Sequence, residues 1–536
     1  MYFLWFLFIF SYLFGDISSR KGSYYQNYEE TSSKNSNTRL DLDLDAAIRR
    51  FSKAITFETV SMDPGVSNVT ELTKFKKHLE ASYPLIHSTP WIERTIVGSL
   101  SIVYTIKSLN HDKNDFTKKP WILQSHQDVA PVFDLHKWDA PPFSGQVLFK
   151  PERMHKVLYD PKTNKRNIKF TIDDANNEKY YVYGRGTADA KHIVMSIMEA
   201  VEYMIGKGLR PIHKTLILSF GHDEEVGGFY GARKVAHLIV NTYPYPPNGG
   251  KPIDFILDEG FTIVKDVLPQ NKKMALVSVS EKYVMDVNMS VVTPGGHSSL
   301  PTKENAISIL SNAVVNIDTN QFASYLAKPG TPDAELLRRI AYLFPQPYRL
   351  YMEHATLYRD KLINMTWDND LINALTRTTE AVTLFNGGIK YNVIPNYAES
   401  NVNYRVHPLQ EPEEVLEYAA HTINDPRVNI QLDTMSPRSP ISDYDTDAFR
   451  IIESTIHDMF NETIVVPTIL VGGTDSKHFA NIVDNAYRFS PLTIVMDDMS
   501  RIHGINERIS VADFYNCVKY YFNLIEKVSG FKMVSN

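Results

Sequence analysis

Several short apolar runs in this chain end abruptly in acidic or histidine residues. The clearest is the run 215–218, which is followed closely by the acidic triplet Asp223, Glu224 and Glu225. Continuous apolar runs of this length, bounded by polar residues, predict strands that are buried on both faces. Four further runs (121–123, 181–183, 253–257 and 492–496) also lead into polar residues, among them His126, Asp128, Asp189, Asp258, Glu259 and His503. Ligands of open α/β sheets bind beyond the carboxyl ends of the strands, so the five runs predict one site at that edge.

The residue types at these strand ends indicate a metal centre. Acids packed at the mouth of a buried strand repel one another unless a cation or a shared proton is present. Two histidines and several carboxylates without cysteine suit a hydrolytic zinc site, and the surplus of carboxylates favours two ions about 3.5–4 Å apart. Taken singly, His126-Gln127-Asp128 is more typical of a surface pair, and the acidic triplet is also compatible with a solvated helix N-terminus. Their recurrence in five places favours a site.

The motifs as a set resemble those of the M20 zinc metallopeptidases, in the branch that contains carboxypeptidase S and the secreted N-acyl amino acid hydrolase/synthase enzymes. Together they span about 120 to 510, and each alone would be a weak signal. In chain order they are SHQDVAPV at 125–132, GRGTADAK at 184–191, SFGHDEEVGG at 219–228, LDEG at 257–260, TPGGHSSLP at 293–301, KYNVIP at 390–395, GGTDSKHF at 472–479 and RIHGINERI at 501–509.

This resemblance implies a role for each strand-end residue. His126 binds one zinc ion and His503 the other, Asp189 bridges the two, and Glu225 completes one shell. One carboxylate of the pair Asp258-Glu259 completes the other shell. We favour Asp258 because it comes directly after the strand, and Glu259 remains the alternative.

Two further residues near the metals take part in the reaction that the resemblance implies. Glu224 is the general base, which takes a proton from a metal-bridging water and passes it to the leaving amine. Asp128 lies two residues after His126 on an extended segment, where alternate side chains share a side, so it can hold the imidazole from behind.

A second group of motifs carries substrate recognition. By the same resemblance, His297 comes from a lid domain and donates a hydrogen bond to the developing oxyanion. Asn392 and Arg405 contact the substrate, and the guanidinium of Arg405 suits a carboxylate. The glycine turn containing Gly473 and Thr474 presents backbone N–H groups to the same carboxylate. Without the neighbouring motif, Arg405 would be interpreted as an ordinary ion pair at a strand edge.

The motif positions predict an α/β fold with an interrupted catalytic domain. We expect a zinc-peptidase-like domain with helices around a mostly parallel sheet at 45–279 and 436–536, and an inserted α+β lid and dimerisation domain at 280–435. Within the lid, residues 320–380 predict an extra, mostly helical insert. The apolar segment at the start is shorter than a bilayer core, which favours a signal peptide over a retained anchor at 1–19. A mobile leader is expected at 20–44.

Composition limits the classes of partner. The chain has 536 residues, 43% hydrophobic content and a net charge of −6, so it can bury a large core and has no general basic field. Nucleic acid is therefore not an expected partner. Cys517 is the only cysteine, which rules out an intrachain disulfide, and its helical context predicts a buried thiol.

These observations lead to one expected function with two alternatives. We expect a secreted or lumenal di-zinc amidohydrolase that cleaves the amide next to a free carboxylate, in a peptide or an N-acyl amino acid. It forms a homodimer through the lid if it follows its relatives. The first alternative is the reverse reaction, which condenses a fatty acid with an amino acid. The second is an inactive binding module on the same scaffold, which the full complement of catalytic groups disfavours.

Overall fold

The computed structural model describes residues 40–149, 156–174 and 176–533. The predicted signal or anchor at 1–19 and most of the predicted leader lie outside the described residues. The described chain forms two compact units. The larger unit contains the described parts of 40–279 together with 442–467 and 474–533, and the smaller unit contains 280–441 and 468–473.

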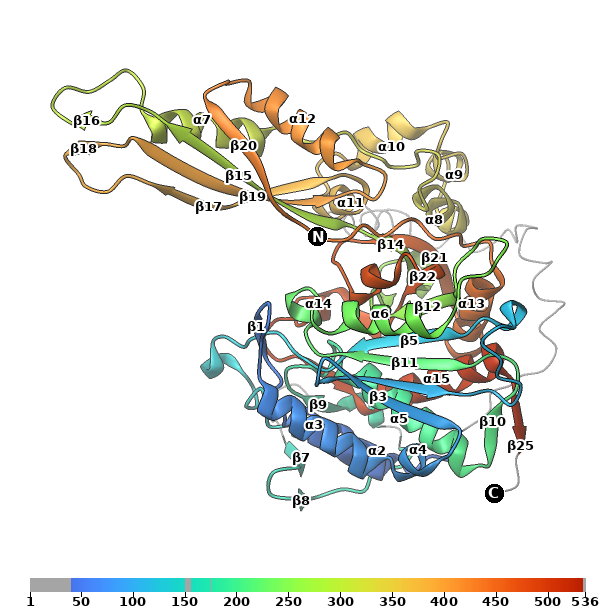
Figure 1. The fold of residues 1–536 in the computed structure, drawn as a ribbon. Coiled ribbons are helices and arrows are strands. Elements are labelled where there is room, and N and C mark those ends of the chain that lie inside the picture. Colours follow the sequence, from blue (N-terminus) through green and yellow to red (C-terminus); the bar gives the residue numbers. More distant parts are fainter. Residues whose placement is uncertain (1–39, 150–155, 175, 534–536) are drawn as a thin grey trace. The chain divides into compact units, whose positions relative to one another are not determined.

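A ten-stranded mixed sheet forms the framework of the larger unit (Figure 1). Its strands follow the order β23-β13-β14-β22-β12-β5-β11-β4-β3, and β21 pairs with β14. The neighbouring strands β22, β12, β5 and β11 are parallel to one another. Strand β4 is antiparallel to both of its neighbours, β11 and β3. The predicted α/β class is confirmed, with the parallel pairs at the centre of a mixed sheet. The strand bounds are β3 (Ile92–Val97), β4 (Ser101–Ile106), β5 (Trp121–His126), β11 (Leu216–Gly221), β12 (Ile253–Asp258), β13 (Ile263–Lys265), β14 (Lys273–Glu281), β21 (Thr463–Leu470), β22 (Val483–Arg488) and β23 (Thr493–Val495).

Helices cover this sheet and account for its apolar sequence. Every residue of β5 and β11 is buried, as expected for parallel strands covered on both faces. Helices α6 and α5 lie on opposite sides of these strands (Figure 1). On α15, Cys517 is buried, as its helical context predicts. The helices of this unit are α2 (Leu44–Ile55), α3 (Val69–Ser82), α4 (Pro84–Ser88), α5 (Lys191–Gly206), α6 (Ala232–Thr242), α13 (Asp447–Met459), α14 (Met496–Met499) and α15 (Val511–Ser529).

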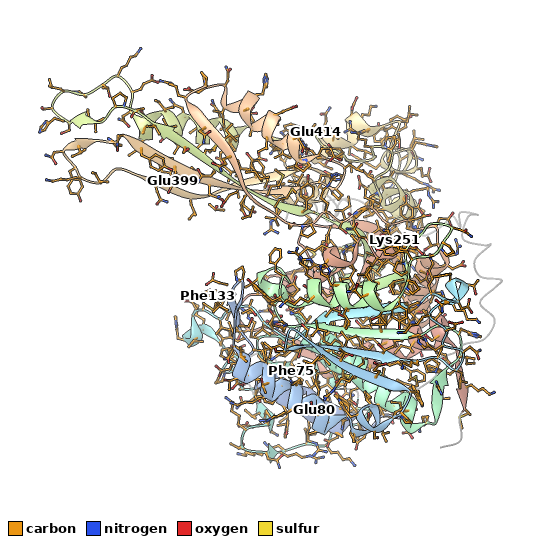
Figure 2. The ribbon with its side chains drawn as sticks, viewed as in Figure 1. Phe75, Glu80, Phe133, Lys251, Glu399 and Glu414 are labelled. Atoms are coloured by element: carbon orange, nitrogen blue, oxygen red, sulfur yellow. The ribbon has the colours of Figure 1, made fainter. Side chains whose placement is uncertain are left out.

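Helix α3 illustrates how the sequence places a helix against this core. Asn68 caps its N-terminus by accepting a hydrogen bond from the Glu71 N–H. Phe75 is fully buried on the inner face, whereas Glu80 forms an ion pair with Arg94 (Figure 2). Within the described residues, no helix combines the length and the apolar character needed to cross a bilayer.

A second, antiparallel sheet in the larger unit overturns part of the strand-end prediction. It has the order β24-β9-β6-β7-β8. The run 181–183 lies in β9 of this sheet, and the run 492–496 lies partly in β23 at the far edge of the main sheet, so the prediction that all five runs end at one sheet edge was wrong. The apolar pattern identifies a buried strand but does not say which sheet the strand joins. The strand bounds are β6 (Val147–Phe149), β7 (Lys156–Asp160), β8 (Lys165–Arg166), β9 (Tyr180–Tyr183) and β24 (Arg508–Ser510), and two small ribbons pair β1 (Ser61–Asp63) with β2 (Val66–Ser67) and β10 (Leu209–Pro211) with β25 (Phe531–Met533).

The smaller unit is an antiparallel sheet with two helices on one face. The sheet has the order β17-β19-β15-β20, and apolar side chains of α7 and α12 pack on β15 and β19 to form its core. A short ribbon of β16 and β18 extends from one end of this sheet (Figure 1). The predicted helical insert is confirmed as α8 to α11. The bounds are β15 (Tyr283–Val292), β16 (Gly296–His297), α7 (Ala306–Thr319), α8 (Asp333–Ile340), α9 (Tyr348–Glu353), α10 (Arg359–Thr366), α11 (Asp370–Thr376), β17 (Thr379–Gly387), β18 (Val393–Ile394), β19 (Tyr397–Val406), α12 (Pro412–Ile423) and β20 (Val428–Met435).

Candidate metal centre

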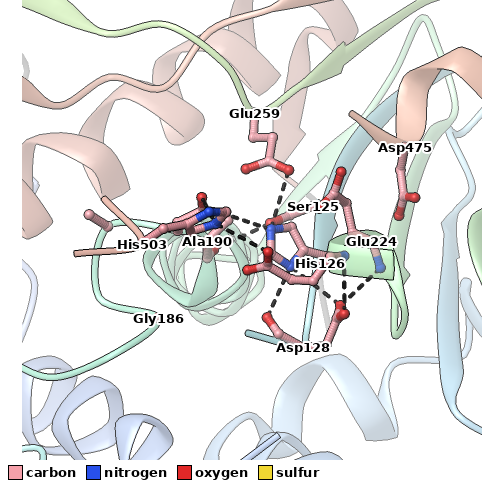
Figure 3. Close-up of polar contacts among 12 residues, drawn as sticks. Ser125, His126, Asp128, Gly186, Ala190, Glu224, Glu259, Asp475 and His503 are labelled. Atoms are coloured by element: carbon pink, nitrogen blue, oxygen red, sulfur yellow. Dashed lines mark hydrogen bonds and ion pairs between the residues drawn. The ribbon is translucent and has the colours of Figure 1, made fainter. Parts of the chain in front are cut away.

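One carboxylate joins the two histidines that the sequence singles out. Asp189 Oδ1 lies 3.0 Å from His126 Nε2, and Asp189 Oδ2 lies 3.0 Å from His503 Nε2. Figure 3 shows His126 and His503 in this cluster. Each oxygen of a single side chain therefore faces a different imidazole. This is the arrangement that a carboxylate bridging two cations requires.

Each histidine also has a second acidic partner. Glu259 Oε1 lies 3.2 Å from His126 Nε2, and Glu225 Oε2 lies 3.1 Å from His503 Nε2. Two overlapping groups of side chains in this cluster have ligand atoms within 4.8 Å of one another, namely His126 with Glu224 and Glu259, and His126 with Asp189 and Glu225. These two groups share His126, and Asp189 contacts both His126 and His503.

The strand register explains why three of these segments meet. His126 is the last residue of β5 and pairs with Gly221, the last residue of β11. Glu224 and Glu225 follow β11 on the short 3-10 helix η5 (Glu224–Val226), and Glu259 follows β12 directly. These three strands are parallel neighbours, so their carboxyl ends lie together at one edge of the sheet. Asp189 and His503 reach this edge from the second sheet, where they flank β9 and β24.

Asp128 connects His126 to the acidic segment after β11. The Nδ1 of His126 donates to the Asp128 carbonyl oxygen at 3.0 Å and lies 3.4 Å from Asp128 Oδ1. The carboxylate of Asp128 also accepts hydrogen bonds from the backbone N–H groups of Glu224 and Glu225, at 3.1 and 3.2 Å. This fixes the proton on Nδ1, which leaves the Nε2 lone pair of His126 to face the acids. The predicted holding position of Asp128 agrees with these contacts.

The geometry corrects the choice between Asp258 and Glu259. The carboxylate of Asp258 accepts hydrogen bonds from the backbone N–H of Ser476 at 2.8 Å and from that of Glu259 at 2.9 Å. Asp258 is the last residue of β12, and successive side chains of an extended segment point to opposite sides. Glu259 therefore faces His126, while Asp258 faces the 474–476 turn. These contacts favour Glu259 over Asp258, the residue preferred from the sequence, as the acidic partner of His126.

The electrostatics of the cluster show a shortage of positive charge. Burial raises the pKa of Glu259 to about 8, and burial followed by the charge of Glu259 holds the pKa of Glu224 well above its usual range. Burial also raises the pKa of Glu225, whose Oε1 is buried without a hydrogen-bond partner among the described residues. Hydrogen bonds to Asp189 and Glu225 raise the pKa of His503 to about 11. A divalent cation would offset the repulsion between these carboxylates. The nitrogen and oxygen donors fit zinc.

His297 and Asn392 lie together in the smaller unit. His297 is on β16, and its neighbour Ser298 donates a backbone hydrogen bond to the Asn392 carbonyl oxygen at 3.2 Å. His297 Nδ1 accepts a hydrogen bond from the Ser299 backbone N–H at 3.2 Å and lies 2.7 Å from the Ser299 hydroxyl. Because Nδ1 accepts, the ring proton is on Nε2, which makes the exposed edge of the imidazole a donor.

The other predicted substrate contacts lie in two different places. Arg405 is next to the end of β19, where its Nε donates to Asn403 Oδ1 at 3.2 Å. Gly473 is exposed, whereas Thr474 is buried and caps the 3-10 helix η8 (Asp475–Phe479) with its side chain. The N–H of Ser476 is already used by Asp258, so this turn offers fewer backbone donors than the glycines suggest.

Sequence reasoning gave no role to three buried charged residues beside the site. Glu507 and Arg185 form an ion pair of 2.6 Å. Asp475 is buried against Gly221 and Gly228, and accepts a hydrogen bond of 3.3 Å from the Gln124 side chain. All three lie within the motifs identified in the sequence. The opposite charges of Arg185 and Glu507 were the only sequence feature that could have suggested their pairing. A single sequence does not show that positions so far apart are in contact.

Comparison with known proteins identifies the class to which this centre belongs. Residues 157–527 match the peptidase family M20/M25/M40, which is more than half of the chain. The chain therefore belongs to this family, as its motifs predict, and it is a hydrolase whose described residues include groups able to hold a metal ion.

The more similar relatives are named either as N-fatty-acyl-amino acid synthase/hydrolases or as carboxypeptidase S-like proteins. The chain is 34% identical over 479 residues to N-fatty-acyl-amino acid synthase/hydrolase PM20D1.1 of Danio rerio, covering 89% of this chain and 84% of the relative. It is 33% identical over 496 residues to probable carboxypeptidase S-like 2 of Dictyostelium discoideum, covering 90% and 85%. Among solved structures, the M20 family metallo-carboxypeptidase Sso-CP2 from Sulfolobus solfataricus matches with a TM-score of 0.59 at 16% identity, over 90% of this chain and 99% of that chain. This structural match supports the fold.

Proposed function

We propose that the chain is a di-zinc amidohydrolase that cleaves the amide bond next to a free carboxylate. The observation that carries this proposal is the position of Asp189, whose two oxygens each lie 3.0 Å from a different histidine. A structural ion pair would need only one of these contacts. We assign the catalytic domain to the larger unit and the lid to the smaller unit.

The two donor sets divide the ligands between the ions. His126, Asp189 and Glu259 would hold one zinc ion, and His503, Asp189 and Glu225 would hold the other. When bound, zinc supplies positive charge that lowers the pKa of water and polarises the amide carbonyl. The protein side chains carry the remaining steps.

Glu224 is the proposed general base. Its carboxylate lies beside His126 and Glu259. We assign it to neither ligand set, and its backbone N–H donates a hydrogen bond to Asp128. As water adds to the amide carbon, Glu224 takes a proton from the water. It then gives this proton to the amide nitrogen as the carbon–nitrogen bond breaks, so that one carboxylic acid and one amine leave.

The lid residues are assigned to the substrate. His297 would donate its Nε2 proton to the developing oxyanion, in keeping with the Ser299 hydrogen bond that holds Nδ1 as an acceptor. Arg405 would bind the free carboxylate, with Asn392, Gly473 and Thr474 as further contacts.

The distance between His297 and Arg405 supports a dimer. His297 pairs with Val393, which precedes β19, whereas Arg405 lies eight residues beyond Tyr397, the first residue of that strand. At about 3.3 Å per residue, Tyr397 and Arg405 alone are about 26 Å apart. The oxyanion and carboxylate of one amino acid unit are separated by a few ångströms only. One lid therefore cannot supply both groups to the same substrate, and we propose that a second copy of the chain supplies one of them.

The names of the relatives support two substrate classes, the C-terminal residue of a peptide and an N-acyl amino acid. Both contain an amide next to a free carboxylate. Condensation of a fatty acid with an amino acid, the reverse reaction, is a second candidate that the synthase/hydrolase names favour. An inactive binding module is a third and weaker candidate. The apolar segment at the start of the sequence supports a secreted or lumenal location.

A substrate panel with metal analysis tests the proposal. Purified protein should contain close to two zinc ions and should hydrolyse dipeptides or long-chain N-acyl amino acids. The C-terminal amide of the same substrate should be cleaved at least about tenfold more slowly, because it lacks the charge that Arg405 binds. Equal rates on the acid and its amide would contradict the carboxylate requirement. Tight substrate binding without turnover, in zinc-loaded protein, would favour the binding module.

A further inference from the structure

The two loops that carry Asp189 and His503 leave the second sheet side by side. Strands β9 and β24 are antiparallel, and Tyr183 pairs with Arg508. The chain that continues from β9 and the chain that enters β24 therefore lie at the same end of this ribbon. Asp189 is on the first of these loops and His503 is on the second.

Neither loop is held by regular secondary structure, so other contacts must fix it. His503 has a positive φ of 57°, and a Cβ added at Gly504 would lie 2.1 Å from the Ser500 carbonyl oxygen. Gly186 has a positive φ of 89°. Tight turns of this kind keep a defined geometry only when the surrounding contacts determine it.

The buried side chain of Glu507 supplies these contacts to the first loop. Its Oε1 accepts hydrogen bonds from the backbone N–H groups of Gly186 at 3.0 Å, Ala188 at 2.7 Å and Asp189 at 3.2 Å. Glu507 is fully buried. One oxygen therefore accepts hydrogen bonds from three backbone N–H groups of the loop that ends in the bridging carboxylate.

Arg185 extends the same network to the second loop. Its Nη1 donates to Glu507 Oε2 at 2.6 Å, and its Nη2 donates to the His503 carbonyl oxygen at 2.8 Å and to the Pro131 carbonyl oxygen at 3.2 Å. Arg185 is 1% exposed. The two side chains thus connect the backbone of Asp189 to the backbone of His503.

A buried ion pair gives little net stability, because desolvation of both charges offsets their attraction. Stability alone is therefore a weak reason for a pair with these contacts. Apart from the Pro131 carbonyl oxygen and the ring of Trp138, over which the guanidinium of Arg185 lies at 5.7 Å, the described side-chain partners of this pair are each other and the two ligand loops. A pair that only filled the core would not need to bind the backbone of both metal ligands.

We propose that Glu507 and Arg185 are positioning residues, which fix the separation of Asp189 and His503 and thereby set the affinity for the ion held by His503. This inference rests on the di-zinc function proposed above. Neither side chain faces a cation itself, so both act through the two ligands. Residues that orient metal ligands in this way typically contribute 10- to 100-fold to metal affinity.

The test compares Glu507→Gln and Arg185→Lys with the matched control Glu199→Gln. Glu199 is also a buried carboxylate and pairs with Arg50 at 2.6 and 2.7 Å, but none of its described partners belongs to a ligand loop. Arg185→Lys keeps a positive charge beside Glu507, so it remains informative if Glu507→Gln fails to fold. The readouts are zinc affinity by chelator competition, the thermal unfolding midpoint, and kcat and KM at rising zinc concentration.

We expect one zinc ion to bind about 10- to 100-fold more weakly in Glu507→Gln and Arg185→Lys, and the other to bind nearly as in the wild type. Excess zinc should restore kcat without a change in KM. Glu199→Gln should lower the unfolding midpoint to a comparable degree and keep both affinities. Unchanged zinc affinity in the two test variants, or an equal loss in Glu199→Gln, would overturn the inference. A wild-type chain that binds fewer than two ions would instead overturn the di-zinc function, and the inference with it.

Discussion

Glu224 and Glu225 are adjacent in the sequence but face different partners. Glu225 contacts His503, whereas Glu224 lies beside His126 and Glu259 as the proposed base. Glu224→Gln should therefore keep both zinc ions and lower kcat by about 10²- to 10⁴-fold, because it removes proton transfer. Glu225→Gln is the matched control and should lose zinc. Metal analysis and steady-state kinetics on both proteins check this, and near-normal kcat in zinc-loaded Glu224→Gln would contradict the assignment.

A second prediction for single residues compares the zinc affinity of variants at Asp258 and Glu259. Glu259 faces His126, and Asp258 binds backbone N–H groups. Glu259→Gln should weaken zinc binding by at least about tenfold, because an amide is a poorer ligand than a carboxylate. Asp258→Asn should weaken it less, since the ligand itself remains. Chelator competition measures both affinities, and a larger loss in Asp258→Asn would restore Asp258 to the ligand set.

At the scale of single elements, helix α3 carries a half-buried histidine, His78, that links stability to pH. Burial lowers the pKa of His78 to about 4, and its Nε2 lies 2.9 Å from the Arg50 carbonyl oxygen. In the unfolded chain its pKa is near 6.5. Between these values the unfolded state binds the proton and the folded state does not, so the stability contributed by His78 is present above pH 6.5 and is lost toward pH 4.

The variant His78→Gln should therefore be relatively more stable in acid. Compared with the wild type, its free energy of unfolding should improve by about 2 kcal/mol between pH 7 and pH 4, because glutamine does not take up the proton. Urea unfolding of both proteins at several pH values provides the measurement. A difference between the two proteins that stays constant across this range would show that His78 does not titrate as its burial indicates.

The ribbon of β16 and β18 carries His297, whose replacement should change the kinetics. His297→Ala should lower kcat by about 10²- to 10³-fold with little change in KM, because the hydrogen bond to the oxyanion forms only in the transition state. Ser299→Ala should have a smaller effect, because the Ser299 backbone N–H still holds Nδ1 of His297. Initial-rate kinetics separate the two parameters. A rise in KM alone would make His297 a binding residue.

At the scale of the whole molecule, subunit mixing tests which chain supplies each lid residue. Glu224→Gln inactivates a site, so mixing it with His297→Ala restores activity only if His297 acts in the partner's site. A statistical mixture would then show about a quarter of wild-type activity. The same experiment with Arg405→Ala tests the other residue. Because His297 and Arg405 lie far apart on one lid, only one of the two mixtures should recover activity. Recovery in both would contradict the division of the two residues between two lids, and recovery in neither would contradict the dimer.

Much of this site could be predicted from the sequence, because its local signals are strong. The runs that form β5, β11 and β12 are apolar, and the residues after them include His126, Glu224 and Glu259. The sheet that β9 joins could not be predicted, since apolar periodicity carries no information on pairing partners. The choice between Asp258 and Glu259 depends on which way a side chain points at the strand end. The contact of Arg185 with Glu507 depends on the tertiary fold alone.

The positions of His126 and His503 along the chain also set the order of events during biosynthesis. His126 leaves the ribosome long before His503, and at about 5–20 residues per second the interval is about 20–75 s. During that time β5, β11 and β12 can form, yet their clustered acids still lack the last imidazole. If the chain holds a second ion as proposed, it can bind that ion only after His503 has been made, when translation is almost finished.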